Sequence, residues 1–138
     1  MTKQVWLNLP VADVATSRTF FRAIGFRESP RHAGNPQLAG FLIGEHDFIV
    51  MLFPESEFKN FTQLPVADTK QASEVLINID AESPEEVDKM RDRVAEAGGH
   101  IYTPPTLVEG FMYLFCFADP DGHRWCVMHM DEAKLAGR

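Results

Sequence analysis

The sequence predicts an α+β fold in which one βαβββ module is used twice. Each half of the chain has the same order of a strand, a helix and three further strands, and the first strands begin at Val5 and Val75. Each predicted helix follows a capping residue and ends at glycine, and a tight-turn motif joins the last two strands. Because neither half buries its sheet alone, we expect the modules to pair into an open, cup-shaped mixed sheet with the helices outside.

Composition limits the classes of protein and partner. At 138 residues, with 45% hydrophobic and 24% charged residues, the chain suits one compact domain or two small modules that share a core. A net charge of −7 argues against nucleic acid and anionic membranes as partners, because both favour basic patches. No apolar run approaches the ~18 residues that a membrane span needs. The N-terminus lacks the apolar stretch of a signal peptide, so we expect a cytoplasmic protein.

The first module is predicted over about residues 4–53. Val5–Val11 is rich in branched apolar residues, as strands are. Asp13 is a suitable N-cap for a helix that ends at Gly25. Three short strands follow, separated by turn-forming residues: Phe26–Arg31, Gln37–Ile43 and Asp47–Phe53.

The second module is predicted over about residues 74–130, with a C-terminal tail at 131–138. Its first strand is Val75–Ile79, and Ser83 caps a helix that begins at Pro84 and ends at Gly98-Gly99. Three strands complete the module: His100–Tyr102 extending towards Val108, Met112–Phe117 and His123–Met130.

Between the modules, residues 54–73 are predicted to form a linker with about one helical turn. Linkers of this length are uncommon in compact domains unless they cover something. Both a lid over the cup and a simple crossover connection fit the sequence.

The motif Asp119-Pro120-Asp121-Gly122 places Asp, Pro and Gly where a type I turn favours them. Cys116 and Cys126 flank this turn at nearly equal distances, so we expect them to face each other across paired strands. They form either a disulfide or two core thiols, and a reducing compartment favours the thiols.

Two motifs resemble those of a known family. The first is Asn-Leu-Pro-Val-Ala-Asp at residues 8–13, followed by Ser17 and Phe20-Phe21, and the second is the turn with His123 and Trp125 after it. Together they resemble the vicinal oxygen chelate superfamily, which contains glyoxalase I, extradiol dioxygenases and bleomycin- and fosfomycin-resistance proteins. The chain is most similar to small bacterial proteins described as predicted lactoylglutathione lyases. The resemblance covers Val5 to Met130 and implies a glyoxalase-like fold and a homodimer.

Catalytic members of that family hold a divalent metal, usually by His, Glu or Gln. The resemblance places the four ligand positions on Trp6, Met51, Glu74 and Cys126, or on Asn8 instead of Trp6 if the first strand shifts by two residues. Indole is not an ordinary metal ligand, and a Met thioether suits copper(I) rather than Ni, Fe or Mn. We therefore expect no cofactor. The alternative is Ni, Zn, Mn or Fe held by Glu74, Cys126 and a further ligand.

Strand alternation gives each strand one apolar face and one mixed face. We expect the mixed faces to line the cup as an apolar, aromatic pocket, although the same side chains are equally typical of a closed core: Trp6, Met51, Phe53, Leu76, Cys126 and Met128. Asn8 shares the face of Trp6, and Arg124 at the rim either binds an anionic ligand or is an ordinary surface residue.

Glu74 is the candidate for chemistry, because a partly apolar cup is expected to raise the pKa of a carboxylate that faces it, which suits the carboxylate to the role of general base. The alternative is a solvated residue at the start of its strand. We expect a glyoxalase-like protein that encloses a small organic ligand in the cup. The alternative is a metal-dependent lyase or dioxygenase that uses Glu74. A third class, a structural or regulatory module, has no positive signal in the sequence.

Overall fold

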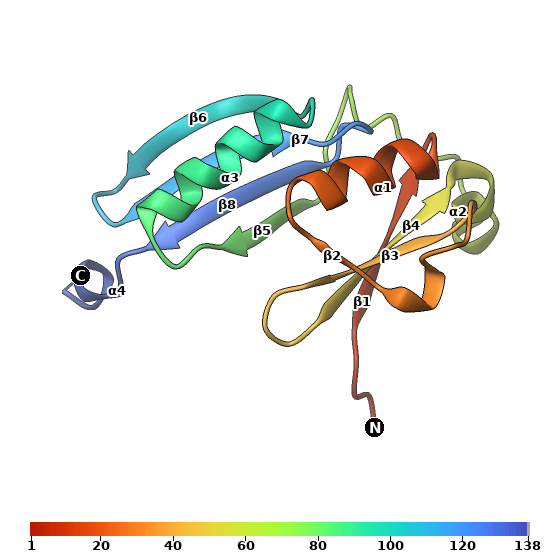
Figure 1. The fold of residues 1–138 in the computed structure, drawn as a ribbon, viewed down its shortest axis with the longest axis horizontal. Helices are drawn as coiled ribbons and strands as arrows, with labels where there is room; N and C mark the ends of the chain where they lie inside the picture. The colour runs from red at the N-terminus through yellow and green to blue at the C-terminus, as the bar shows by residue number, and fades with distance from the viewer. Residues whose placement is uncertain (138) are drawn as a thin grey trace. The chain divides into compact units, whose positions relative to one another are not determined.

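A computed structural model describes residues 1–137 and divides the chain into two compact units, Met1–Asp68 and the remainder from Thr69. Each unit contains one four-stranded mixed sheet whose spatial order is first strand, last strand, third strand, second strand (Figure 1). The predicted α+β class and the doubled βαβββ plan are therefore confirmed. The division between the units falls inside the predicted linker.

The sheet of the first unit has the order β1-β4-β3-β2. Strand β1 (Trp6–Val11) pairs in parallel with β4 (Phe48–Pro54), and β3 (Ala39–Ile43) pairs antiparallel with β4. Helix α1 (Val14–Ala23) covers one face of this sheet (Figure 1). Its ring of Phe21 lies 5.7 Å from that of Phe41, between ring centroids, in the buried core of the unit.

The predicted ends of α1 are confirmed, but the N-cap works differently from the expectation. The backbone of Asp13 is extended, and its side chain accepts a hydrogen bond from Thr16 Oγ1 at 2.6 Å instead of capping a backbone N–H. That hydroxyl lowers the pKa of the Asp13 carboxyl below its usual value. At the other end Gly25 has φ of 99°, a left-handed conformation that glycine adopts without steric cost.

The predicted strand Phe26–Arg31 is wrong over most of its length. Strand β2 contains only Arg27–Glu28, and the chain turns into a short 3₁₀ helix, η1 (Pro30–His32). The cause is a long-range contact: Arg18 of α1 donates to Glu28 Oε1 at 2.6 Å and to the carbonyl oxygens of His32, Asn35 and Leu38. This guanidinium holds the irregular segment that follows η1 through carbonyls of residues 32, 35 and 38, and the predicted strand from Gln37 begins only at Ala39.

The linker is also more ordered than expected. It contains α2 (Glu55–Thr62), a helix of 8 residues where about one turn was predicted, and α2 contacts β1 and β4. The ring of Phe61 meets that of Phe53 at a centroid distance of 5.7 Å. As far as Thr62 the segment is thus part of the first unit, and its role as a lid stays a prediction.

The second unit has the sheet order β5-β8-β7-β6. Strand β5 (Leu76–Asp80) is parallel to β8 (Arg124–Met130), and β7 (Met112–Ala118) lies antiparallel between β8 and β6 (His100–Val108). Helix α3 (Pro84–Glu96) covers one face, as Figure 1 shows, and a short α4 (Glu132–Ala136) lies within the predicted tail.

The core of this unit lies between α3 and the sheet. The strands supply Trp125, Phe115 and Phe117, all fully buried, and α3 supplies Val87 and Val94. Ser83 caps α3 as predicted, because its Oγ accepts the backbone N–H of Glu86 at 3.2 Å. Among residues 1–137, no helix is long and apolar enough to cross a membrane.

Candidate functional site

The sheet of the second unit has one face against α3 and one face opposite it, which we call the distal face. Trp125 and Val127 of β8 are buried towards α3, so Arg124, Cys126 and Met128 belong to the distal face. Two residues of β5 lie beside these side chains on the same face, because the strand register pairs Leu76 with Arg124 and Asn78 with Cys126. The structure therefore brings four of the predicted site residues to one face: Leu76, Arg124, Cys126 and Met128.

A cavity of about 400 Å³ opens at one end of the distal face, where Leu76 and Arg124 lie. The guanidinium carbon of Arg124 lies 4.4 Å from the ring centroid of Tyr102, a cation–π contact. Burial and the neighbouring Cys116 thiol raise the pKa of Tyr102, and the charge of Arg124 acts in the opposite direction. The rest of the lining comes from the segment that precedes β5: Thr69, Lys70, Gln71, Ala72 and Ser73.

Two thiols lie at the middle of the distal face. Cys116 of β7 is the direct register partner of Cys126 of β8, which confirms that the two cysteines face each other across paired strands. Both are free thiols. Burial, together with Cys116, raises the pKa of the Cys126 thiol to about 12, so that it stays protonated at neutral pH.

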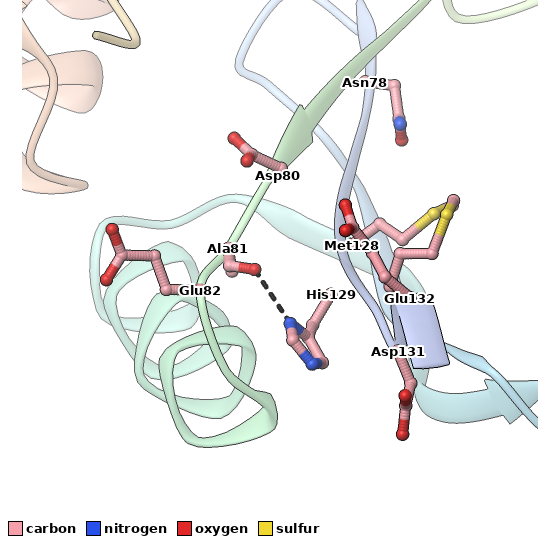
Figure 2. Close-up of a pocket in the computed structure, with 9 residues that line it drawn as sticks. Asn78, Asp80, Ala81, Glu82, Met128, His129, Asp131 and Glu132 are labelled. Carbon is pink, nitrogen blue, oxygen red and sulfur yellow. Dashed lines mark hydrogen bonds between the residues drawn. The ribbon is translucent and has the colours of Figure 1, made fainter. Parts of the chain in front are cut away.

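A larger hollow of about 700 Å³ lies at the opposite end of the distal face (Figure 2). Its lining includes Asn78 and Met128 of the distal face, and also His129, which shares the other face of β8 with Trp125 and Val127 and whose Nδ1 lies 3.1 Å from the carbonyl oxygen of Ala81. The acidic side chains at this hollow point in different directions and do not converge on one point (Figure 2): Asp80, Glu82 and Asp131. Within the described residues, no three His, Cys, Asp or Glu side chains are placed to hold a metal ion.

The positions at which the resemblance places metal ligands hold unsuitable donors in the structure. Glu74 lies in an exposed bend before β5 rather than inside the strand, and it is Asn78 that pairs with Cys126. In the first unit, Met51 is nearly buried and packs against Gly40, where an added Cβ would lie 2.8 Å from the Met51 sulfur. An indole, a packed thioether and a protonated thiol are poor donors for a borderline divalent cation. The donor set at these positions does not fit such a metal.

The predicted residues of the first unit share the face opposite α1. Asn8 of β1 is the register partner of Met51 of β4, and Trp6 is 54% exposed on the same side of β1. Phe53 lies further along β4, in contact with Phe61 of α2. The expected strand alternation is thus present, and the role of these four residues in binding stays a prediction.

Sequence reasoning missed the part played by Asp119. Its carboxylate is only 6% exposed: Oδ1 accepts the backbone N–H groups of Asp121 and His123, and Oδ2 accepts the indole N–H of Trp125, all at 3.0 Å. Burial raises the pKa of Asp119 to about 6, although the charge of His123 and the indole hydrogen bond oppose the shift. A Trp six residues after the first Asp of the turn was the signal available in the sequence.

The family follows from a comparison of the whole chain. A sequence model of the Glyoxalase/Bleomycin resistance protein/Dioxygenase superfamily matches residues 3–127. The chain belongs to this superfamily. Among curated protein sequences, none matches it.

Several solved structures share the fold of this chain. Hypothetical protein SA1046 from S. aureus has 32% sequence identity and a TM-score of 0.82, with 94% of this chain and 95% of that chain covered. A glyoxalase/bleomycin resistance protein/dioxygenase family enzyme from Burkholderia phytofirmans PsJN has 18% identity and a TM-score of 0.75, with coverage of 91% and 96%. Fosfomycin resistance protein FosX from Mesorhizobium loti has 17% identity and a TM-score of 0.68, with coverage of 99% and 98%.

Proposed function

We propose that this superfamily member binds a small organic ligand on the distal face of its second unit. The observation that carries the proposal is the pair of hollows, about 400 and 700 Å³, at the two ends of the row Arg124, Cys126 and Met128, in which the middle residue Cys126 is only 3% exposed. Both volumes fall within the range of roughly 300–1,000 Å³ that is usual for ligand pockets. Arg124 lines the smaller hollow at one end of the row and Met128 lines the larger hollow at the other end, so a ligand can enter at either end.

The chemistry of the row suits binding. The Met128 thioether, which lines the larger hollow, is polarisable and nearly apolar, so it favours the flat or aliphatic body of an organic molecule, and the buried Cys126 thiol beside it adds no charge. Beside them Asn78 offers both a hydrogen-bond donor and an acceptor, which can fix the orientation of that molecule. Glu74 lies in an exposed bend outside β5, so the proposal does not rely on a general base there.

Methyl NMR of methionine tests this proposal directly. The chain has 6 methionines, so selective ¹³C-methyl labelling gives a small set of assignable signals. Fragments with and without acidic groups are titrated into the full chain. We expect binding fragments to shift the Met128 signal, because Met128 lies on the distal face, and to leave Met90 on α3 unchanged as the internal control. If no fragment shifts Met128, or if every binder acts at Met90, the proposal is wrong.

A metal assay separates this proposal from the family's metal-dependent chemistry. The purified chain is exposed to Ni, Zn, Mn and Fe(II), freed of excess metal and analysed for its elements. We expect no stoichiometric retention, because Cys126 would first have to lose a strongly held proton. Retention of about one ion per chain that Glu74→Ala or Cys126→Ser abolishes would instead support a metal-dependent lyase or dioxygenase.

A further inference from the structure

The smaller cavity has a charge opposite to that of the chain as a whole. The chain carries a net charge of −7, yet the cavity lining contains Lys70 and Arg124 and no carboxylate. The larger hollow has the reverse character, with four acidic residues in its lining: Asp80, Glu82, Asp131 and Glu132. The two hollows therefore differ in the sign of the charge that lines them, and the smaller one attracts anions.

Arg124 keeps most of its hydrogen-bonding capacity. Other arginines are held by acidic partners, for example Arg18 and Arg22 by Glu28. Within residues 1–137, Arg124 takes part in no ion pair, and its stacking contact and one side-chain hydrogen bond are both with Tyr102. Stacking uses the flat face of a guanidinium and leaves N–H groups at its edge, in the fork that matches a carboxylate.

The cavity wall is fixed by the hairpin turn. The hydroxyl of Thr69 donates to the carbonyl oxygen of Asp121, and the segment 69–70 packs directly on Gly122. A Cβ added to Gly122 would lie 3.1 Å from both the Thr69 oxygen and Lys70 Cγ. Because the turn holds this segment in contact, Lys70 lies in the wall of the cavity.

We infer that this cavity, with Lys70, Tyr102 and Arg124 in its lining, binds the acidic group of a small organic carboxylate. The inference rests on the proposed function, because the remainder of the ligand lies along the distal face. Leu76 pairs with Arg124 at the cavity and Asn78 with Cys126 next to it, so an acid bound at Arg124 directs its apolar body towards the thiols and Met128. The ligand class is thus an organic monocarboxylate with an aromatic or aliphatic body.

Benzoate and its neutral counterpart benzamide are the probes, because they share a ring and differ in charge. Binding is followed in the full chain by the Leu76 methyl and Arg124 Nε–H signals. We expect benzoate to shift both signals and to bind about tenfold more tightly than benzamide, with an affinity that falls as salt is added. Inorganic phosphate is expected to compete with benzoate at the same residues.

Variants identify the cation responsible. Arg124→Gln is expected to weaken benzoate binding about tenfold and Lys70→Gln about threefold, since a guanidinium binds a carboxylate at two points. Arg124→Lys keeps the charge without the fork, and we expect an intermediate affinity, which also covers the case in which the glutamine variant folds poorly. Arg93→Gln, a change of the same charge on the exposed surface of α3, is the matched control and leaves the affinity unchanged.

Equal affinity for benzoate and benzamide overturns the inference, as does an Arg124→Gln variant that binds benzoate like Arg93→Gln. If neutral fragments still shift Met128 in that case, the proposed function stands and only the carboxylate class is wrong. If benzoate binds through Arg124 but neither it nor any fragment reaches Met128, the proposed function fails instead, and the cavity is an anion site on its own.

Discussion

At the scale of single residues, Asp119 shows how a buried carboxylate is retained in a turn. Burial disfavours its charge, and three N–H groups compensate in part by donating to it. The balance leaves the pKa at about 6, against an ordinary value of 3.8. The turn therefore contains a group that titrates close to neutral pH.

The raised pKa of Asp119 makes stability depend on pH. Between about pH 4 and 6 the folded state binds this proton more tightly than the unfolded state, so the contribution to the free energy of unfolding is complete below about pH 4 and is lost as pH rises through 6. The difference between the two pKa values corresponds to about 3 kcal/mol in the free energy of unfolding. In urea unfolding, we expect the stability of the wild type relative to Asp119→Asn to fall between pH 4 and 7. The indole N–H signal of Trp125 is expected to shift with a midpoint near pH 6, and a flat profile in both measurements would contradict the assignment.

Cys126 is expected to be chemically inert in the folded chain. With a pKa of about 12 and 3% exposure, it is almost entirely thiol at pH 8, and the thiolate is the form that reacts. Alkylation by iodoacetamide, followed by mass spectrometry, is expected to be at least about a hundredfold slower at Cys126 in the native chain than in denaturant. Rapid native alkylation of Cys126 would show that the thiol is neither buried nor protonated.

At the scale of elements, the turn at residues 119–122 connects the core to the anion cavity. Gly122 has φ of 86°, and a methyl group there would press on the Thr69 backbone. We expect Gly122→Ala to lower the free energy of unfolding by about 1–3 kcal/mol, because left-handed strain and the contact add together. It is also expected to weaken benzoate binding by displacing Lys70. Gly34→Ala, at a position with no atom within 4 Å of the added Cβ, is the control. Unchanged stability and binding in Gly122→Ala would mean that the wall is not set by the turn.

Local chemistry was enough to predict most elements from sequence. Asp13 before α1, Ser83 with Pro84 before α3, and the glycines after both helices predicted the helix starts and ends correctly. The failure at 26–31 has a different origin: Arg18 binds carbonyl oxygens up to 20 residues away, and no local pattern encodes that contact. The length of α2 was likewise underestimated, because its Phe61 is ordered by a ring on β4.

The candidate site likewise divides into features that follow from local sequence patterns and features that depend on long-range contacts. Strand parity predicted that Leu76, Arg124, Cys126 and Met128 share a face, since alternation is a property of the strand itself. The cavity wall was not predictable, because it depends on a hydrogen bond between Thr69 and Asp121, 52 residues apart. Burial of Asp119 and the stacking of Arg124 on Tyr102 also arise from tertiary contacts.

At the scale of the whole molecule, the chain leaves large apolar side chains exposed in both units. They include Val5 and Phe61 in the first unit and Leu107 in the second, with exposures of 72%, 71% and 58%. Exposed side chains of this kind are costly when they cluster, and they are common where a second chain binds. Together with the family resemblance, they lead us to expect a homodimer.

Sedimentation velocity at micromolar concentrations tests this expectation, and we expect the mass of two chains. Single glutamate substitutions at Val5, Phe61 and Leu107 introduce a charge into each exposed apolar site in turn. At least one is expected to raise the dimer dissociation constant about tenfold or more, because an unpaired charge at the centre of an interface is strongly unfavourable. Lys3→Glu, an exposed position that is already polar, serves as the control for the added negative charge. A wild-type chain that sediments as a monomer across this range would show that its exposed apolar residues are not covered by a second copy.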